Sequence, residues 1–207
     1  ASRQLVELSN QIIRNRHLYN ANTIAKVYAL LAKDASNRED VAKAFQFASD
    51  GLTQPSLSPE IKLRLLQSLS DGYYANGKYH KTIETANKSI AIATSRAELK
   101  FLLIAFGHRA MAFALTADYQ KANDDLAKVA SLIKDNPQFF EHLELLEIVA
   151  IAHFYLNDFD TASNTHNKII QIKQERNLEQ TLAQSYYNLA RSYEGQSRLD
   201  DAFNAYW

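Results

Sequence analysis

Apolar residues recur at intervals of three and four positions along most of the chain, and short polar breaks separate the blocks. In one block Leu66 is followed by Ser70 and Tyr73. After a break, a second set begins at Tyr79 and continues at Thr82. Residues with this spacing lie on one face of an α-helix. The pattern predicts two amphipathic helices joined by a short turn.

The same pattern returns every 40 residues, so side chains of one kind can be aligned in columns. The columns are Leu66, Phe106, Leu146 and Tyr186 (large); Ser70, Ala110, Ala150 and Ala190 (small); Tyr73, Phe113, His153 and Tyr193 (rings); Tyr79, Tyr119, Phe159 and Leu199 (large); and Thr82, Ala122, Ala162 and Ala202 (small). Between the helices, the turn falls at Gly77, Ala117, Asn157 and Ser197. Such internal similarity indicates a repeat protein built from helical hairpins.

The columns predict the domain organisation. We expect a single domain over residues 1–207, with an N-terminal helix at 1–20 and hairpins at 21–57, 58–97, 98–137, 138–177 and 178–207, the last of them incomplete. In two places, Ser58-Pro59 and Asn136-Pro137, a capping side chain precedes a proline. This arrangement is typical of a helix start, so helices should begin near residues 59 and 137.

The order of side chains resembles the tetratricopeptide repeat (TPR). In that repeat the first helix carries a large, a small and then an aromatic residue, and the second helix opens with an aromatic residue and alanine. The usual repeat has about 34 residues, and a length of about 40 would by itself fit HEAT or armadillo repeats. The ring and small columns on either side of a tight turn favour the TPR. The resemblance covers about residues 21–207.

The resemblance implies an all-α fold, a right-handed superhelical solenoid of about five TPR-like hairpins. The longer repeats are similar to those of bacterial regulatory proteins. These include MalT-like activators, Rap-type peptide receptors, and sensor regions attached to diguanylate cyclases or histidine kinases.

Charge and composition narrow the range of partners. The chain has 23 Lys and Arg residues and 23 Asp and Glu residues, with no block of like charges, which argues against nucleic acid as a partner. The most apolar stretch, at 145–156, contains Glu147 and His153 and is too short to span a bilayer, so we expect no membrane contact by this segment. Without cysteine the compartment stays open between bacterial periplasm and cytoplasm.

Signals for catalysis are absent from the sequence. It has no phosphate-binding glycine loop, no HExxH or GxSxG motif and no cysteine, and its six histidines are scattered. We therefore expect no catalytic residue, cofactor or metal site. An enzyme with a site between repeats stays an unsupported alternative.

The first helices of such hairpins line a concave groove, which predicts the ligand-binding residues. We expect the groove to be lined by Arg64, Gln67, Asp71, Tyr74, Met111, Leu115, Glu147, Ile151, Phe154, Tyr155, Tyr187, Asn188 and Arg191. Its apolar middle and polar ends would suit an extended peptide or an amphipathic helix. Alternatively, Met111, Leu115 and Ile151 pack between repeats.

Arg109 occupies a column that otherwise holds Leu69, Val149 and Leu189. A charge at a core position must reach solvent or find a partner. One interpretation is a local shift of the helix that lets Arg109 reach solvent. The other is an arginine that projects into the groove and contacts an anionic ligand.

These observations predict a non-catalytic module that binds a protein or peptide in its groove. On the resemblance, it would be the sensory or regulatory input region of a larger bacterial signalling or transcriptional regulatory protein. The alternative is a free-standing scaffold or assembly adaptor that mediates protein–protein interaction or dimerisation, and a homodimer would fit it.

Overall fold

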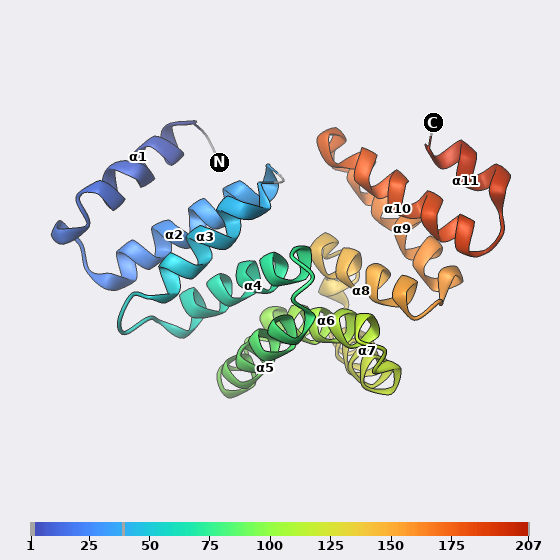
Figure 1. The fold of residues 1–207 in the computed structure, drawn as a ribbon, viewed down its shortest axis with the longest axis horizontal. Helices are drawn as coiled ribbons and strands as arrows, with labels where there is room; N and C mark the ends of the chain where they lie inside the picture. Colours follow the sequence, from blue (N-terminus) through green and yellow to red (C-terminus); the bar gives the residue numbers. More distant parts are fainter. Residues whose placement is uncertain (1–2, 39, 207) are drawn as a thin grey trace. The chain divides into compact units, whose positions relative to one another are not determined.

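The computed structural model describes residues 3–38 and 40–206, and this part of the chain is helical and contains no strand (Figure 1). Its helices are α1 (Arg3–Arg14), η1 (Arg16–Leu18), α2 (Ala21–Asn37), α3 (Val41–Leu52), α4 (Pro59–Ala75), α5 (Tyr79–Arg96), α6 (Leu99–Leu115), α7 (Tyr119–Lys134), η2 (Pro137–Phe139), α8 (Leu143–Tyr155), α9 (Phe159–Glu175), η3 (Glu179–Thr181), α10 (Leu182–Gly195) and α11 (Leu199–Tyr206), where η marks a 3-10 helix. The predicted all-α class is confirmed.

Internal contacts divide the chain into two units, Ala1–His108 and Arg109–Trp207, which we call unit 1 and unit 2. The boundary falls inside α6. The expected single domain and its repeat boundaries stay a prediction, and each unit is described by itself.

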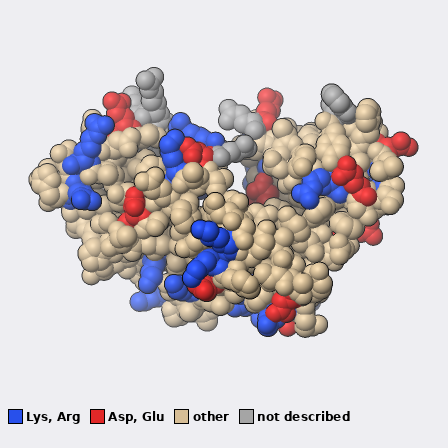
Figure 2. Space-filling model, in the orientation of Figure 1, with Lys and Arg blue, Asp and Glu red and all other residues tan. Residues whose placement is uncertain are grey.

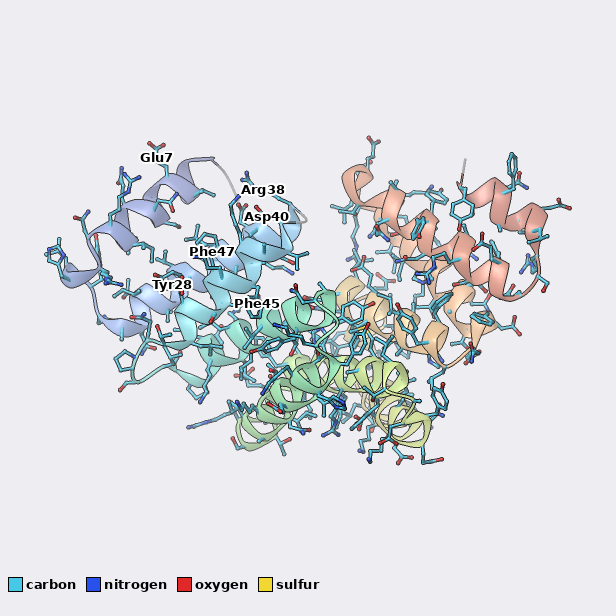
Figure 3. All side chains as sticks on the ribbon, in the orientation of Figure 1. Glu7, Tyr28, Arg38, Asp40, Phe45 and Phe47 are labelled. Carbon is cyan, nitrogen blue, oxygen red and sulfur yellow. The ribbon has the colours of Figure 1, made fainter. Side chains whose placement is uncertain are left out.

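In unit 1, α2 packs against α3, α3 against α4, and α4 against α5. Aromatic rings lie between these helices (Figure 3). Tyr28 of α2 lies 6.4 Å from Phe47 of α3, centroid to centroid. Phe45, also on α3, meets Tyr73 of α4 edge-on at 5.2 Å. Edge-on ring pairs add to the free energy gained by burying the rings, so they help to fix α3 between its neighbours.

In unit 2, α9 packs against both α8 and α10, and α10 packs against α11. Phe159, the first residue of α9, meets Phe154 of α8 edge-on at 5.4 Å. Its ring also lies against the backbone of Gly195, where a Cβ would come within 2.5 Å of the ring. Gln196 donates to the carbonyl of Phe159 at 2.8 Å. The absence of a side chain at Gly195 therefore lets the end of α10 approach α9.

The small columns predicted from the sequence are buried. Exposure is 0 to 1% at Ser70, Ala110, Ala150 and Ala190, and 0 to 3% at Thr82, Ala122, Ala162 and Ala202. Small side chains let helix backbones approach closely, and any longer side chain at these positions would push the helices apart. The prediction of two small columns is confirmed.

The turns inside the hairpins share one backbone conformation. Gly77, Ala117, Asn157 and Ser197 have positive φ angles of 67°, 60°, 60° and 60°. In the first turn, Lys78 N–H donates to the carbonyl of Tyr73 at 2.8 Å, and Gly77 N–H donates to Tyr74. The later turns repeat both bonds. This pair of bonds is the Schellman motif, which satisfies carbonyls at a helix end.

Of the two predicted helix starts, one is confirmed and one is wrong. Helix α4 begins at Pro59, as expected. Pro137 instead opens the short 3-10 helix η2, and α8 begins only at Leu143. The reason lies in Asn136, whose side-chain amide donates to the carbonyl of Leu132 at 2.8 Å. Asn136 therefore caps the end of α7 and does not cap the next helix.

Candidate binding surface

The predicted groove residues of unit 1 lie on α4, and two of them bond inside the unit. Arg64 donates to Glu60 through Nη2 at 2.9 Å and lies 5.8 Å from the centre of the Phe101 ring. Asp71 Oδ1 lies 2.8 Å from His108 Nε2, and His108 is 2% exposed. The charges of this stripe are therefore largely satisfied by the protein itself.

The other two predicted residues of α4, Gln67 and Tyr74, are half-buried. The Tyr74 ring lies 6.3 Å from that of Tyr79, which opens α5. This contact joins the two helices of one hairpin.

Arg109 is not an anion-binding residue of the groove, which corrects one expectation. Its guanidinium forms a two-pronged ion pair with Asp125 of α7, with Nε–Oδ2 at 2.6 Å and Nη2–Oδ1 at 2.8 Å. Asp125 is 1% exposed, and Lys128 also donates to it at 3.1 Å. The Arg109 side chain keeps 18% of its surface in solvent, so the interpretation that it reaches solvent stays a prediction beside this ion pair with a buried carboxylate of the same hairpin.

Sequence reasoning missed Asp125, although the sequence contains a signal for it. The equivalent positions of the neighbouring copies hold Thr85 and Thr165. Arg109 and Asp125 thus depart from their columns together, on facing helices of one hairpin. Two opposite charges that break two columns of the same repeat indicate a pair.

Met111 is a second correction. Its exposed fraction is 2%, and its neighbours Ala112 and Ala114 are 0% and 4% exposed. Met111 therefore belongs to the core, as the packing alternative predicts, and its side chain cannot contact a ligand at the surface. Leu115 and Ile151 are half-buried and keep part of their surface in solvent.

Glu147 bonds inside unit 2. Its Oε1 atom lies 2.7 Å from Nζ of Lys173 on α9. Lys173 is 5% exposed and also donates to Ser185 Oγ at 2.8 Å and to the carbonyl of Thr181 at 3.2 Å. A buried ammonium needs several acceptors, and here they come from α8, η3 and α10. Glu147 therefore has a structural role, as the ion-pair partner of Lys173, besides its predicted place in the groove.

Four side chains of unit 2 form a surface cluster around Arg191 of α10. The Cζ atom of Arg191 lies 4.5 Å from the centre of the Phe154 ring and 5.9 Å from that of Tyr187. Tyr187 in turn lies 5.9 Å from Tyr206 of α11. We call Phe154, Tyr187, Arg191 and Tyr206 the Arg191 cluster. The structure thus brings together three of the predicted groove residues and adds Tyr206, which sequence reasoning did not assign to the groove.

Two rings of the Arg191 cluster are largely open to solvent. Tyr187 is 48% exposed and Tyr206 is 42% exposed. Phe154 is half-buried, and Tyr155 meets it edge-on at 5.4 Å. Exposed rings beside a guanidinium offer both apolar area and hydrogen-bonding groups.

The charge of Arg191 has no carboxylate partner within 4 Å among residues 3–38 and 40–206. Arg198, in the same unit, provides a contrast. It also lies over a ring, 4.4 Å from the centre of Tyr193, but Asp201 pairs with it at 2.7 Å. Stacking on a ring therefore does not by itself prevent an ion pair, and Arg191 stays open to an external anion.

Asn188 lies one turn before Arg191 on the same face of α10. Its Oδ1 atom accepts a hydrogen bond from Gln184 Nε2 at 3.1 Å. Its Nδ2 group has no acceptor in the part of the chain that the structure describes. Asn188 can therefore supply a second hydrogen-bond donor near Arg191.

Glu194 is the carboxylate that lies one turn after Arg191 on α10. Its charge acts on the hydroxyl of Tyr206 on α11. Burial raises the pKa of Tyr206 above its usual value of 10.0, and Glu194 raises it further. The Tyr206 hydroxyl therefore stays protonated at neutral pH.

Other kinds of site have no support in the described residues. Within residues 3–38 and 40–206, no group of three or more His, Asp or Glu side chains is placed to hold a metal ion. None of the described helices combines the length and the apolar character that a membrane-spanning helix needs. On the face shown in Figure 2, basic and acidic side chains are interspersed among uncharged ones.

Several solved structures resemble this arrangement of helices. BtubC (BKLC) from P. vanneervenii is 16% identical with a TM-score of 0.59, and the match covers 98% of this chain and 84% of that one. A putative kinesin light chain from Podosopora anserina, with nearly identical TPR-like repeats, is 17% identical with a TM-score of 0.53, covering 87% and 90%. A variant of it reaches 0.54 at 17% identity, covering 90% and 93%.

The chain has the fold of a TPR-like repeat domain. At such low identity the likeness establishes the fold of the TPR-like chain and leaves its ligand to be argued from its own residues. No family model matches the sequence, and no curated protein is significantly similar to it. The resemblance drawn from the columns is confirmed at the level of the fold.

Proposed function

We propose that this TPR-like chain is a non-catalytic module that binds a protein or peptide, and that the contact surface includes the first helices α8 and α10. The Arg191 cluster is the observation that carries the proposal. Tyrosine and arginine are the residue types that contribute most to binding energy at protein interfaces. Here two half-exposed tyrosines adjoin an arginine whose charge no described carboxylate neutralises.

The finer role that we propose is the regulatory input of a larger bacterial signalling or transcriptional protein. The 40-residue length of the repeats supports it, because repeats of this length resemble those of bacterial regulators. Binding at the Arg191 cluster would order Tyr187 and Tyr206, and hence the packing of α10 on α11. Such a change is one means by which a bound ligand could affect an attached domain.

A second candidate function is that of an assembly adaptor which associates with itself. The observation in its favour is the apolar surface of α11, where Leu199 is 69% exposed and Phe203 is 62% exposed. Analytical ultracentrifugation tests it. A concentration-dependent dimer that Leu199→Ser and Phe203→Ser abolish would support the adaptor, and a monomer at all concentrations would exclude it.

Phage display tests the binding function. Random peptides displayed on phage are selected for binding to the purified chain. Peptides that bind are synthesised and their affinity is compared between Tyr187→Ala and the matched control Tyr119→Ala. Tyr119 is equally exposed, at 49%, but lies on α7 outside the Arg191 cluster. We expect Tyr187→Ala to weaken binding about tenfold or more and Tyr119→Ala to leave it unchanged. Failure to select any peptide above background would contradict the proposal.

A further inference from the structure

The Arg191 cluster has the features of a site for one negative charge. We infer that it binds the side-chain carboxylate of an acidic residue in a partner peptide, with a large apolar or aromatic residue of the same peptide against Tyr187 and Tyr206. The inference rests on the proposed function and adds to it the chemistry of the ligand. Four features of the site support it.

The first feature is the way in which the guanidinium of Arg191 is held. Phe154 at 4.5 Å and Tyr187 at 5.9 Å lie next to Cζ. A planar guanidinium can contact rings through its faces while its N–H edge donates to a carboxylate. Because the rings restrict the side chain before any ligand arrives, less conformational entropy is lost when a carboxylate binds.

The second feature is charge. Within the described residues no carboxylate lies within ion-pair distance of Arg191, whereas Arg64, Arg109 and Arg198 each have one. The carboxylate nearest along α10 in the C-terminal direction, Glu194, is three residues from Arg191 and forms no ion pair with it in the described part of the chain. A ligand carboxylate would therefore complete a pair that other arginines of the chain form internally.

The third feature is a second donor. Asn188 accepts from Gln184 through Oδ1, and its Nδ2 group is available to donate to a ligand. A carboxylate has two oxygens, each able to accept more than one hydrogen bond. The guanidinium and the Asn188 amide on one helix face can thus share one carboxylate, or the amide can bond to the peptide backbone beside it.

The fourth feature decides which anion fits. Glu194, one turn from Arg191, would repel a phosphate group with two charges about twice as strongly as a carboxylate with one. A polyanion such as nucleic acid would need a run of basic groups, whereas the chain has equal numbers of basic and acidic residues. The open rings of Tyr187 and Tyr206 favour a neighbouring apolar side chain, which a peptide supplies. A single carboxylate in a peptide therefore fits the site best.

The inference is tested by phage display on the whole chain, on Arg191→Gln and on Arg198→Gln, with random peptides whose C-terminus is fused to the coat protein. Arg198 is the matched control because it stacks on Tyr193 but is neutralised by Asp201. We expect Asp or Glu to be enriched at one position of the peptides selected by the unchanged chain and by Arg198→Gln. For Arg191→Gln we expect no such enrichment.

Synthetic peptides, acetylated at the N-terminus and amidated at the C-terminus, then give the affinity by fluorescence anisotropy. Exchanging the selected Glu for Gln should weaken binding to the unchanged chain about tenfold, the loss of one charge-assisted contact. Against Arg191→Gln the same exchange should change the affinity by less than about twofold. A peptide with a free C-terminal carboxylate and Gln in place of Glu should not recover the affinity.

Each result separates this inference from the proposed function. Peptides that bind at Tyr187 without an acidic preference, or with a preference that Arg191→Gln retains, would overturn the carboxylate site and leave the binding function standing. Recovery of affinity by the free C-terminus would likewise overturn the side-chain carboxylate. Failure to select any peptide would overturn both.

Discussion

Asp71 of α4 and Arg191 of α10 occupy the same position of the repeat, three copies apart, yet they have opposite relations to their surroundings. Asp71 lies 2.8 Å from a ring nitrogen of the buried His108. Arg191 lies over two rings, without a carboxylate partner in the described residues. The same repeat position thus forms an internal contact that stabilises unit 1, whereas in unit 2 its charge is available to a ligand. Burial of the partner therefore decides whether a charged residue at this position stabilises the fold or is available for binding.

The difference extends to the rest of the two stripes. Arg64 pairs with Glu60 one turn away, and Gln184 holds the position that corresponds to Arg64. The Arg64–Glu60 pair is more than half exposed on both sides, so it contributes little to the free energy of unfolding. The bonds that matter for stability are those with a buried partner, at His108, Asp125 and Lys173.

The largest expected effect comes from removing the buried carboxylate of Asp125. Asp125→Ala leaves the guanidinium of Arg109, 18% exposed, without its two-pronged partner. Breaking a buried pair on one side costs about 3 to 5 kcal/mol, and we expect a loss of about 3 kcal/mol because the guanidinium of Arg109 is partly exposed and can be partly solvated. Urea denaturation followed by circular dichroism measures the change.

The control is the double variant Arg109→Leu with Asp125→Thr. It installs the residue types of the neighbouring hairpin, Leu69 and Thr85. Replacing a whole buried pair by uncharged groups is often neutral or stabilising, and the hydroxyl of the equivalent Thr85 donates to the Lys81 carbonyl within its helix, so the double variant should recover most of the lost stability. If it is as unstable as Asp125→Ala, the pair is not the cause.

The sequence predicts the fold well because the repeat columns are set by close packing, which tolerates few side chains. Ala110 and Ala150 are fully buried, and the turn at Gly77 recurs with positive φ at Asn157. The start at residue 137 could not be predicted, because whether Asn136 caps the helix before it or after it depends on a side-chain rotamer. The repeat columns reflect the side-chain sizes that close packing requires, and they do not indicate which helix a residue such as Asn136 caps.

The candidate site is predicted less well from the sequence. Phe154, Tyr187 and Arg191 were expected in one groove and do lie together. Met111 was placed on the surface and is buried, because an unusually apolar α6 gives no clear boundary between its two faces. Partners from other helices, such as Asp125 for Arg109, follow from tertiary structure and not from spacing along one helix.

Acid should weaken unit 2 through His166, which is 2% exposed. Burial, and to a lesser degree the charge of Lys173, lowers the pKa of His166 from 6.5 to about 4. Between these values the unfolded chain binds a proton that the folded chain does not, so stability is fully present above about pH 6.5 and is lost as the pH falls toward 4. The loss should approach about 3 kcal/mol.

Urea denaturation at several pH values checks this prediction. The control is His166→Leu, which installs the residue type of the equivalent buried position, Leu126. It should remove most of the pH dependence in this window. A variant that loses stability with acid as steeply as the parent would show that another group is responsible.

A direct test of the comparison between α4 and α10 exchanges each charge for a neutral group. Asp71→Ala leaves a nitrogen of the buried His108 without its acceptor, which should cost about 1 to 2 kcal/mol. Arg191→Gln removes only contacts with two rings at the surface and should cost about 0.5 kcal/mol. Chemical denaturation of both variants gives the two values. Equal losses would mean that Arg191 is as structural as Asp71 and would weaken its assignment to binding.

The last comparison concerns the turns, where unit 1 has a glycine at the positive-φ position and the first turn of unit 2 has an alanine. Gly77 in unit 1 and Ala117 in unit 2 have φ angles of 67° and 60°, a conformation in which a Cβ is strained. No atom lies within 4 Å of a Cβ added at Gly77, so Gly77→Ala should cost only this strain, about 1 kcal/mol. Ala117→Gly should gain about 0.5 kcal/mol, because glycine relieves the strain but adds entropy to the unfolded chain. Thermal unfolding would detect both shifts. A loss of stability in Ala117→Gly would mean that packing of the Ala117 methyl group stabilises the fold by more than the backbone strain destabilises it.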